Sequence, residues 1–102
     1  MSISPKEQLL QRIRDHSAVV AIVGLGYVGL PLGVAFAEKG FHVVGIDVDP
    51  GKVDAINRGH SYISDIPSHR LLAVTDGAGR LRASTAYAAL LACHAVLICQ
   101  PP

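Results

Sequence analysis

Glycines at positions 24, 26 and 29 and an aspartate at position 47 have the types and spacing of a dinucleotide-binding site. The glycines form a Gly-x-Gly-x-x-Gly pattern between a β-branched run and a predicted helix. Gly24 allows a tight turn, Gly26 lets the backbone approach a diphosphate, and Gly29 lets the helix pack against the strand. The N-terminus of that helix offers N–H groups and a partial positive charge to the phosphates.

Asp47 ends the next predicted strand, at about the 20-residue offset of a ribose-binding acid. Its carboxylate is placed to accept hydrogen bonds from the adenosine ribose, and it repels a 2′-phosphate, so the sequence favours NAD over NADP. The alternative is that Asp47 only begins a turn, although Asp49 is better placed to cap the following helix. Lys52, in the first turn of that helix, either reaches the adenosine side of the cofactor or is a solvated surface lysine.

The uncharged run from Ala18 to Ala37 is also long enough to span a bilayer, and Ala35-Phe36-Ala37 resembles a signal-peptide cleavage site. Four glycines and a proline lie within the run, and Asp15 comes shortly before it. A strand that ends in Asp47 then follows at the distance of a β-α-β unit. We therefore expect neither a membrane segment nor a secretory signal.

Composition excludes several other classes of function. The 102 residues allow one domain, and nine basic against eight acidic residues give a net charge of +1, which does not favour nucleic-acid binding. Cys93 and Cys99 match no zinc or CxxC spacing, and the five histidines form no ligand-spaced cluster, so we expect no metal site. The low cysteine content fits a reducing cytoplasm.

The pattern of apolar residues, caps and glycines predicts alternating helices and strands. Ser4, Pro5 and Glu7 mark a helix start, with Leu9, Leu10 and Ile13 on one face. Further helices are expected from the glycine loop to about Lys39, from Pro50 to Gly59, in the short segment before Gly77, and over 85–93. Strands are expected over 18–23, 41–47 and 81–84, with a last buried strand over 95–100.

This alternation predicts an α/β fold, a Rossmann-type doubly wound parallel sheet. Strands without polar alternation fit a sheet that is covered on both faces. A complete fold of this type usually has about six strands, whereas this chain ends at Gln100-Pro101-Pro102, directly after its fourth predicted strand. We therefore expect residues 1–102 to be one domain truncated to about four strands, a fragment of a longer protein.

Three stretches, IVGLGYVGLPLG, GIDVDPGKVDAINRG and GRLRAST, resemble the N-terminal NAD-binding domain of the UDP-glucose/GDP-mannose dehydrogenase family. The resemblance runs from about Val19 to Gln100. Within the family, GLGYVGLPL is more similar to the UDP-N-acetylhexosamine branch than to the UDP-glucose branch. INRG and LRAST are similar to UDP-N-acetyl-D-mannosamine dehydrogenases in particular, with UDP-N-acetyl-D-glucosamine dehydrogenases as the alternative.

The resemblance implies roles for individual residues. The loop that matches the family's diphosphate site contributes bare glycines and backbone N–H groups, at Gly24, Gly26, Tyr27, Val28 and Gly29. Asp47 matches the ribose-binding acid, and Lys52 matches a basic residue that often approaches the adenosine. The last strand departs from the family's VPTP, because the chain reads CQPP. Gln100 replaces the valine and Pro102 the threonine, so one hydroxyl contact to the cofactor is lost.

The resemblance also implies an activity for the full-length protein. Such enzymes oxidise the C6 hydroxymethyl group of a nucleotide sugar to a carboxylate in two NAD-dependent steps, through a covalent intermediate on a cysteine. The family's catalytic cysteine and assisting lysine lie in central and C-terminal UDP-sugar-binding domains. We expect no catalytic residue in this fragment, and Cys93 and Cys99 do not match the nucleophile.

The same resemblance implies an enzyme of polysaccharide biosynthesis that is a homodimer at full length, and from its cysteine content we expect a cytoplasmic location. Two alternatives remain. The chain could be a stand-alone dinucleotide-sensing module without catalysis, since its glycine pattern would be the same. It could also belong to a dehydrogenase for another substrate, such as a 3-hydroxyacyl compound or 6-phosphogluconate, although such enzymes are not expected to carry INRG and GRLRAST together.

Overall fold

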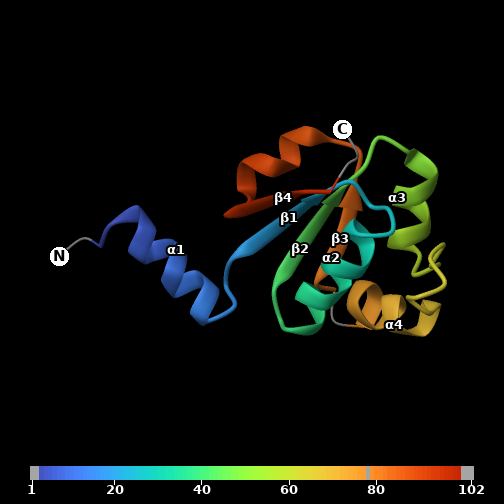
Figure 1. The fold of residues 1–102 in the computed structure, drawn as a ribbon, viewed down its shortest axis with the longest axis horizontal. Coiled ribbons are helices and arrows are strands. Elements are labelled where there is room, and N and C mark those ends of the chain that lie inside the picture. The colour runs from blue at the N-terminus through green and yellow to red at the C-terminus, as the bar shows by residue number, and fades with distance from the viewer. Residues whose placement is uncertain (1–2, 78, 100–102) are drawn as a thin grey trace.

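A four-stranded parallel sheet forms the centre of the computed structural model, which describes residues 3–77 and 79–99 (Figure 1). Its strands are β1 (Val19–Val23), β2 (His42–Ile46), β3 (Leu81–Ser84) and β4 (Ala95–Ile98), in the spatial order β3-β2-β1-β4. The chain therefore builds outward from β1 through β2 to β3, and then crosses back to place β4 on the other side of β1. This order is the first part of a doubly wound fold and confirms the predicted fold class.

Helices connect the strands and also precede them. They are α1 (Pro5–Arg14), α2 (Gly29–Glu38), α3 (Pro50–Asn57) and α4 (Ser68–Leu72), which continues into the π-helical turn η1 (Ala73–Gly77), and the 3₁₀ helix η2 (Tyr87–Ala92). The uncharged run from Ala18 to Ala37 is divided between β1, the glycine loop and α2. Among the described residues, no helix has the length and apolar character needed to cross a membrane.

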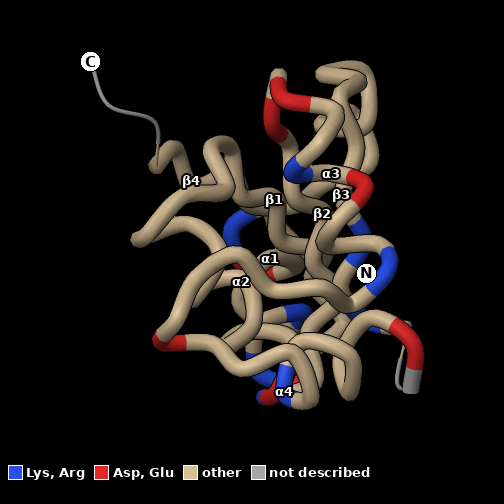
Figure 2. Tube along the Cα trace, turned by 90° about the vertical axis from the view of Figure 1, so that its right-hand side faces the viewer, with Lys and Arg blue, Asp and Glu red and all other residues tan. Residues whose placement is uncertain are grey.

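Helix α1 extends away from the sheet (Figure 1). It forms as predicted, but its apolar face is not packed, since no residue of α1 is buried and Leu10 and Ile13 are 39% and 43% exposed. Charged residues of both signs are interspersed over the described part of the chain (Figure 2).

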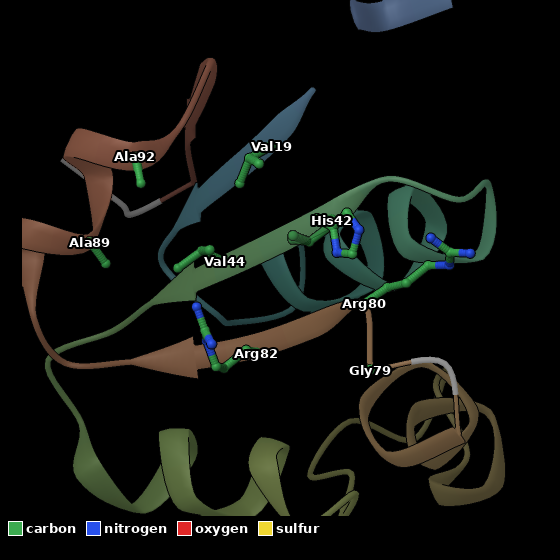
Figure 3. Close-up of a pocket in the computed structure, with 9 residues that line it drawn as sticks. Val19, His42, Val44, Gly79, Arg80, Arg82, Ala89 and Ala92 are labelled. Carbon is green, nitrogen blue, oxygen red and sulfur yellow. The ribbon is translucent and has the colours of Figure 1, made fainter. Parts of the chain in front are cut away.

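The two faces of the sheet are covered unequally. Helices α2, α3 and α4 cover one face, where Ile22 and Val43 pack with side chains such as Val34, Ile56 and Leu71. The opposite face carries a smaller cluster, in which Ala89, Leu90 and Cys93 from η2 and its end pack against three sheet residues, Val23, Val44 and Ile46. A hollow of about 370 Å³ remains on this second face, between η2 and the strands (Figure 3).

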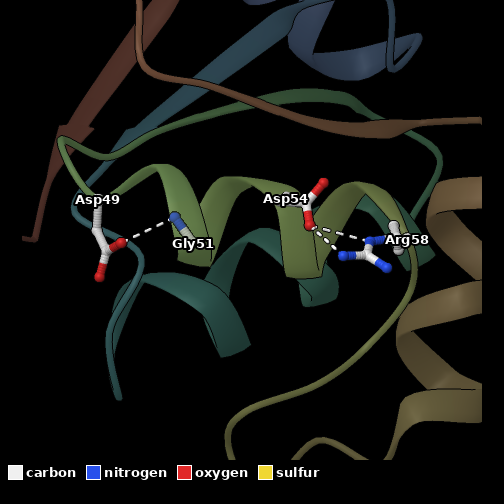
Figure 4. Close-up of polar contacts among 4 residues, drawn as sticks. All are labelled: Asp49, Gly51, Asp54 and Arg58. Carbon is white, nitrogen blue, oxygen red and sulfur yellow. Dashed lines mark hydrogen bonds and ion pairs between the residues drawn. The ribbon is translucent and has the colours of Figure 1, made fainter.

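Local signals in the sequence account for where the helices begin and end. The Ser4 hydroxyl accepts a hydrogen bond from the Glu7 N–H (3.1 Å), which caps α1. The Asp49 carboxylate accepts one from the Gly51 N–H (2.8 Å), which caps α3 (Figure 4). Gly40 and Gly59, at φ values of 101° and 74°, turn the chain after α2 and α3, where other residues would be strained.

Two predicted elements differ from the structure. The segment 85–93 contains a 3₁₀ helix rather than a longer α-helix. The predicted buried strand over 95–100 was wrong in its burial, because β4 spans only Ala95–Ile98 and its side chains Val96 and Ile98 are 44% and 74% exposed. Since β4 is an edge strand and neither side chain belongs to the cluster that η2 forms with the sheet, both remain in contact with solvent. Gln100, Pro101 and Pro102 lie outside the described residues.

The outer edge of β3 is paired with a side chain instead of a strand. The Asn57 amide oxygen accepts a hydrogen bond from the Ala83 N–H (2.9 Å), and the Asn57 amide nitrogen donates one to the Ala83 carbonyl (3.0 Å). The side chain therefore satisfies both backbone groups of an edge residue that is otherwise buried. It also joins the INRG stretch at the end of α3 to the LRAST stretch of β3.

We predict that Asn57→Ala lowers the free energy of unfolding by about 1–2 kcal/mol, because it leaves two backbone groups of Ala83 without partners. Urea unfolding followed by circular dichroism measures this change. Arg58→Ala on the same helix is the matched control, since it removes only an exposed ion pair with Asp54 (Figure 4). Equal losses from the two substitutions would show that the Asn57 contacts contribute nothing specific.

Candidate functional site

The glycine corner, residues 24–29, links the end of β1 to the start of α2. Gly24 has a φ of 96°, a conformation that strongly favours glycine. The Gly24 N–H donates to the Ile46 carbonyl (2.8 Å), so the corner is attached to the end of β2. The chain then enters α2, where the Leu30 N–H donates to the Gly26 carbonyl (3.1 Å).

Gly29 and Gly26 are required for different reasons. A Cβ atom on Gly29 would lie 1.7 Å from the Gly24 carbonyl oxygen, so only glycine lets α2 approach the corner this closely. A Cβ atom on Gly26 would meet no atom within 4 Å. Nothing in the protein itself therefore excludes a side chain at Gly26. Its absence instead keeps open the space beside the backbone, which fits a closely approaching ligand.

The N-terminus of α2 is free of side-chain caps. Val28 occupies its N-cap position and makes no side-chain hydrogen bond there, and no acidic residue lies in the first turn. Helices α1 and α3 differ, because Ser4 and Asp49 cap them. The first N–H groups of a helix lack intrahelical partners and carry partial positive charge, so this end of α2 is suited to bind an anion.

Asp47 directly follows β2 and faces the glycine corner. It is 7% exposed; its Oδ2 accepts a hydrogen bond from the Leu25 N–H (2.9 Å), and its Oδ1 accepts one from the Asp49 N–H (2.9 Å). A carboxylate has about four acceptor positions, so acceptor capacity remains for the hydroxyls of a sugar. Asp47 thus has a structural contact to the corner that its position in the sequence did not indicate.

The pKa of Asp47 reflects opposing effects. Burial raises it, whereas the N–H groups of Leu25 and Asp49 and the positive charge of Lys52 lower it, and the net result is a pKa below the ordinary value. The carboxylate is therefore ionised at neutral pH. A negative charge at the cavity wall is suited to accept hydrogen bonds from hydroxyl groups, and it disfavours a nearby phosphate.

A cavity of about 620 Å³ brings the predicted residues together. It is lined by Gly24, Leu25, Gly26, Tyr27, Val28, Asp47, Lys52 and Cys99. Gly29 is the exception, because it is buried behind the corner and shapes the cavity without lining it. The hollow on the other face of the sheet lies elsewhere and contains none of these residues.

Sequence reasoning missed three residues at this site. Leu25 was only a variable position of the glycine pattern, yet its N–H binds Asp47. The sequence indicated no role for Cys99, but this residue is half-buried and lines the cavity. The Tyr62 hydroxyl donates to the Leu25 carbonyl from a loop far along the chain. An aromatic residue in a polar loop was the available signal for Tyr62. Within residues 3–77 and 79–99, no cluster of His, Cys, Asp and Glu could hold a metal ion.

Comparison with known proteins agrees with this geometry. The model for the UDP-glucose/GDP-mannose dehydrogenase family, NAD binding domain, matches residues 18–102. The UDP-N-acetyl-D-mannosamine dehydrogenase of Escherichia coli K12 is 40% identical over 68 residues, which are 67% of this chain and 16% of that enzyme. The resemblance inferred from the motifs is therefore confirmed.

Solved structures show the same relationship. The GDP-mannose dehydrogenase of Pseudomonas aeruginosa, solved as a ternary complex, is 35% identical, with a TM-score of 0.74 over 80% of this chain and 19% of its own. An NDP-N-acetyl-D-galactosaminuronic acid dehydrogenase of Methanosarcina mazei is 26% identical, with a TM-score of 0.78 over 98% of this chain and 22% of its own. The chain thus spans only 16–22% of the length of these three proteins.

The two glycines of the corner should respond differently to the same substitution. We expect Gly29→Ala to lower the free energy of unfolding by at least about 3 kcal/mol, because its Cβ collides with the Gly24 carbonyl. Gly26→Ala should change it by no more than about 0.5 kcal/mol, since the new methyl group meets open space. Urea unfolding of both variants tests this, and similar losses would contradict the assignment.

Asp47→Asn should lower stability by about 1–3 kcal/mol at neutral pH, because it weakens two hydrogen bonds to a charged group. Because the folded-state pKa lies below the unfolded one, this contribution is present above the ordinary pKa of about 4 and is lost as pH falls through the folded-state value. The difference between the two proteins should hold from pH 8 to about pH 5 and shrink below about pH 4.

Urea unfolding across this pH range measures the effect. Asp65→Asn, in an exposed part of the loop 60–66, is the control and should leave stability at neutral pH unchanged. A difference between wild type and Asp47→Asn that grew on acidification would contradict the ionised, hydrogen-bonded Asp47.

Proposed function

Because this chain belongs to the UDP-glucose/GDP-mannose dehydrogenase family, whose NAD-binding domain it matches over residues 18–102, we propose that the cavity between the glycine corner and Asp47 holds NAD. The observation that carries this proposal is that the bare face of Gly26 and the ionised carboxylate of Asp47 line one cavity. A diphosphate and the sugar next to it require these two surfaces side by side.

Each residue of the corner then has a role in holding the cofactor. The diphosphate lies along Gly24 and Gly26, and it accepts hydrogen bonds from backbone N–H groups at Tyr27 and Val28. The buried Gly29 contributes by letting the N-terminus of α2 come this close to the corner. Asp47 accepts hydrogen bonds from the hydroxyls of the adenosine ribose. Lys52, which is half-buried at the same cavity, approaches the adenosine side.

We extend this proposal to the full-length protein, an NAD-dependent nucleotide-sugar 6-dehydrogenase. NAD, when bound, would supply the hydride acceptor for two successive oxidations of the C6 hydroxymethyl group to a carboxylate, with water as the source of the second carboxylate oxygen. The role of this chain is to bind and orient the cofactor, while residues outside it supply the UDP-sugar site and the catalytic cysteine. A homodimer and a cytoplasmic location belong to the same proposal.

A UDP-N-acetylhexosamine is the substrate class that we favour, and within it UDP-N-acetyl-D-mannosamine. The Escherichia coli relative is named as a dehydrogenase of that sugar, and the INRG and LRAST stretches agree with this choice. A panel of UDP-sugars, assayed with the full-length protein by NADH absorbance, tests it. Faster turnover of UDP-glucose than of every N-acetylated sugar would overturn the substrate assignment.

For the chain itself, we predict that NAD binds at least about tenfold more tightly than NADP, because Asp47 repels the 2′-phosphate at a cost of about 1.4 kcal/mol or more. Asp47→Ala should narrow this preference. Gly26→Ala should abolish NAD binding while the domain stays folded, because its methyl group occupies the space of the diphosphate. Calorimetry with both cofactors, at a temperature where circular dichroism shows each variant folded, provides the measurement.

The outcomes separate the parts of the proposal. Equal affinities for NAD and NADP in the wild-type chain would contradict the placement of Asp47 at the adenosine ribose. Unchanged NAD affinity in folded Gly26→Ala would place the diphosphate elsewhere.

A further inference from the structure

The loop 60–66 lies against the glycine corner and is firmly attached to the domain. Ile63 and Ile66 are buried, at 4% and 2% exposure. The Ser61 hydroxyl accepts a hydrogen bond from the Ile63 N–H (3.2 Å), and the Ser61 N–H donates to the Ser68 hydroxyl (3.1 Å). The loop therefore presents Tyr62, which lies between two anchored positions, in a defined place.

Tyr62 and Asp47 hold the same residue of the corner from opposite ends. The Leu25 N–H donates to the Asp47 carboxylate, and the Leu25 carbonyl accepts from the Tyr62 hydroxyl. In a trans peptide the C=O and the following N–H point in opposite directions within one plane. A hydrogen bond that fixes the Leu25 carbonyl therefore also fixes the direction of the Gly26 N–H.

The ring of Tyr62 makes a second contact with the site. Lys52 Nζ lies 5.9 Å from the ring centroid, at the outer range of a cation–π interaction. Lys52 lines the main cavity, and it also lines a smaller hollow of about 190 Å³ together with Tyr62 and Gly26. The attraction between ring and cation favours positions of the ammonium group on the Tyr62 side of the cavity.

We infer that Tyr62 is a positioning residue for the dinucleotide: its hydroxyl orients the Gly26 N–H toward the diphosphate, and its ring holds Lys52 beside the adenosine ribose. This inference rests on the proposed function, because it assigns the diphosphate and ribose to that cavity. Tyr62 itself touches the protein groups that bind the cofactor, and it acts through them.

Two substitutions separate the hydroxyl from the ring. Tyr62→Phe should weaken NAD binding about 2–10-fold, the usual effect of one hydrogen bond. Tyr62→Leu should weaken it by about a further 2–5-fold, because the contact with Lys52 is also lost. Tyr87→Phe is the matched control, since Tyr87 lies in η2 on the other face of the sheet, and its NAD affinity should equal that of wild type.

A double-mutant cycle distinguishes positioning from a general effect on the fold. If the ring acts through Lys52, Lys52→Met should reduce NAD affinity in the wild type and in Tyr62→Phe, but much less in Tyr62→Leu. Calorimetry measures these affinities. An equal effect of Lys52→Met in all three backgrounds would overturn the role of the ring.

The role of the hydroxyl has a readout that does not require NAD. The amide resonance of Gly26 should shift in the NMR spectrum of Tyr62→Phe and stay in place in Tyr87→Phe. An unchanged Gly26 resonance, or unchanged NAD affinity in Tyr62→Phe while the wild type binds NAD, would overturn the inference alone. A wild-type chain that does not bind NAD would overturn the proposed function as well.

The native chain provides a further test should Tyr62→Phe fail to fold. The ring resonances of Tyr62 should shift during a titration of the wild-type chain with NAD. NAD bound beside the glycine corner and Lys52 changes the chemical environment of these two groups, and both of them contact Tyr62. No shift at saturation would overturn the inference.

Discussion

The buried hydrogen bond from the Leu25 N–H to the Asp47 carboxylate joins the two segments on which the site depends. One segment is the corner after β1, and the other is the connection after β2. An ionised carboxylate is costly to bury unless hydrogen-bond donors surround it. Here the backbone supplies those donors, so the corner and the charge stabilise each other, and Asp47 also lines the cavity beside the corner.

Much of the fold could be predicted because its signals are local. Ser4 and Asp49 mark helix starts by chemistry that acts within three residues, and Gly40 and Gly59 mark helix ends by their conformation. The glycine corner was predictable for the same reason, since the backbone geometry that requires its glycines involves only the end of one strand and the start of the next helix. The apolar runs located β1, β2 and β3 to within about one residue.

What the sequence did not reveal depends on contacts between distant segments. Tyr62 reaches Leu25 across 37 positions of the chain, and no periodicity predicts such a pair. The burial of β4 depends on what covers its face, and an apolar sequence cannot state whether a covering element is present. The Asn57 contact with Ala83 is similar, because the INRG and LRAST stretches are informative as motifs but their pairing appears only in three dimensions.

The Asn57 side chain also makes the two edges of the sheet unequal in their capacity to pair with a further strand. Because its amide occupies the outward backbone groups of Ala83, the β3 side resists the addition of another strand, from this chain or from a second molecule. Among the described residues, no side chain hydrogen-bonds to the outward backbone groups of β4 in this way, and β4 is short and half-exposed. Extension of the sheet, and any aggregation through strand exchange, should therefore proceed more readily from β4 than from β3.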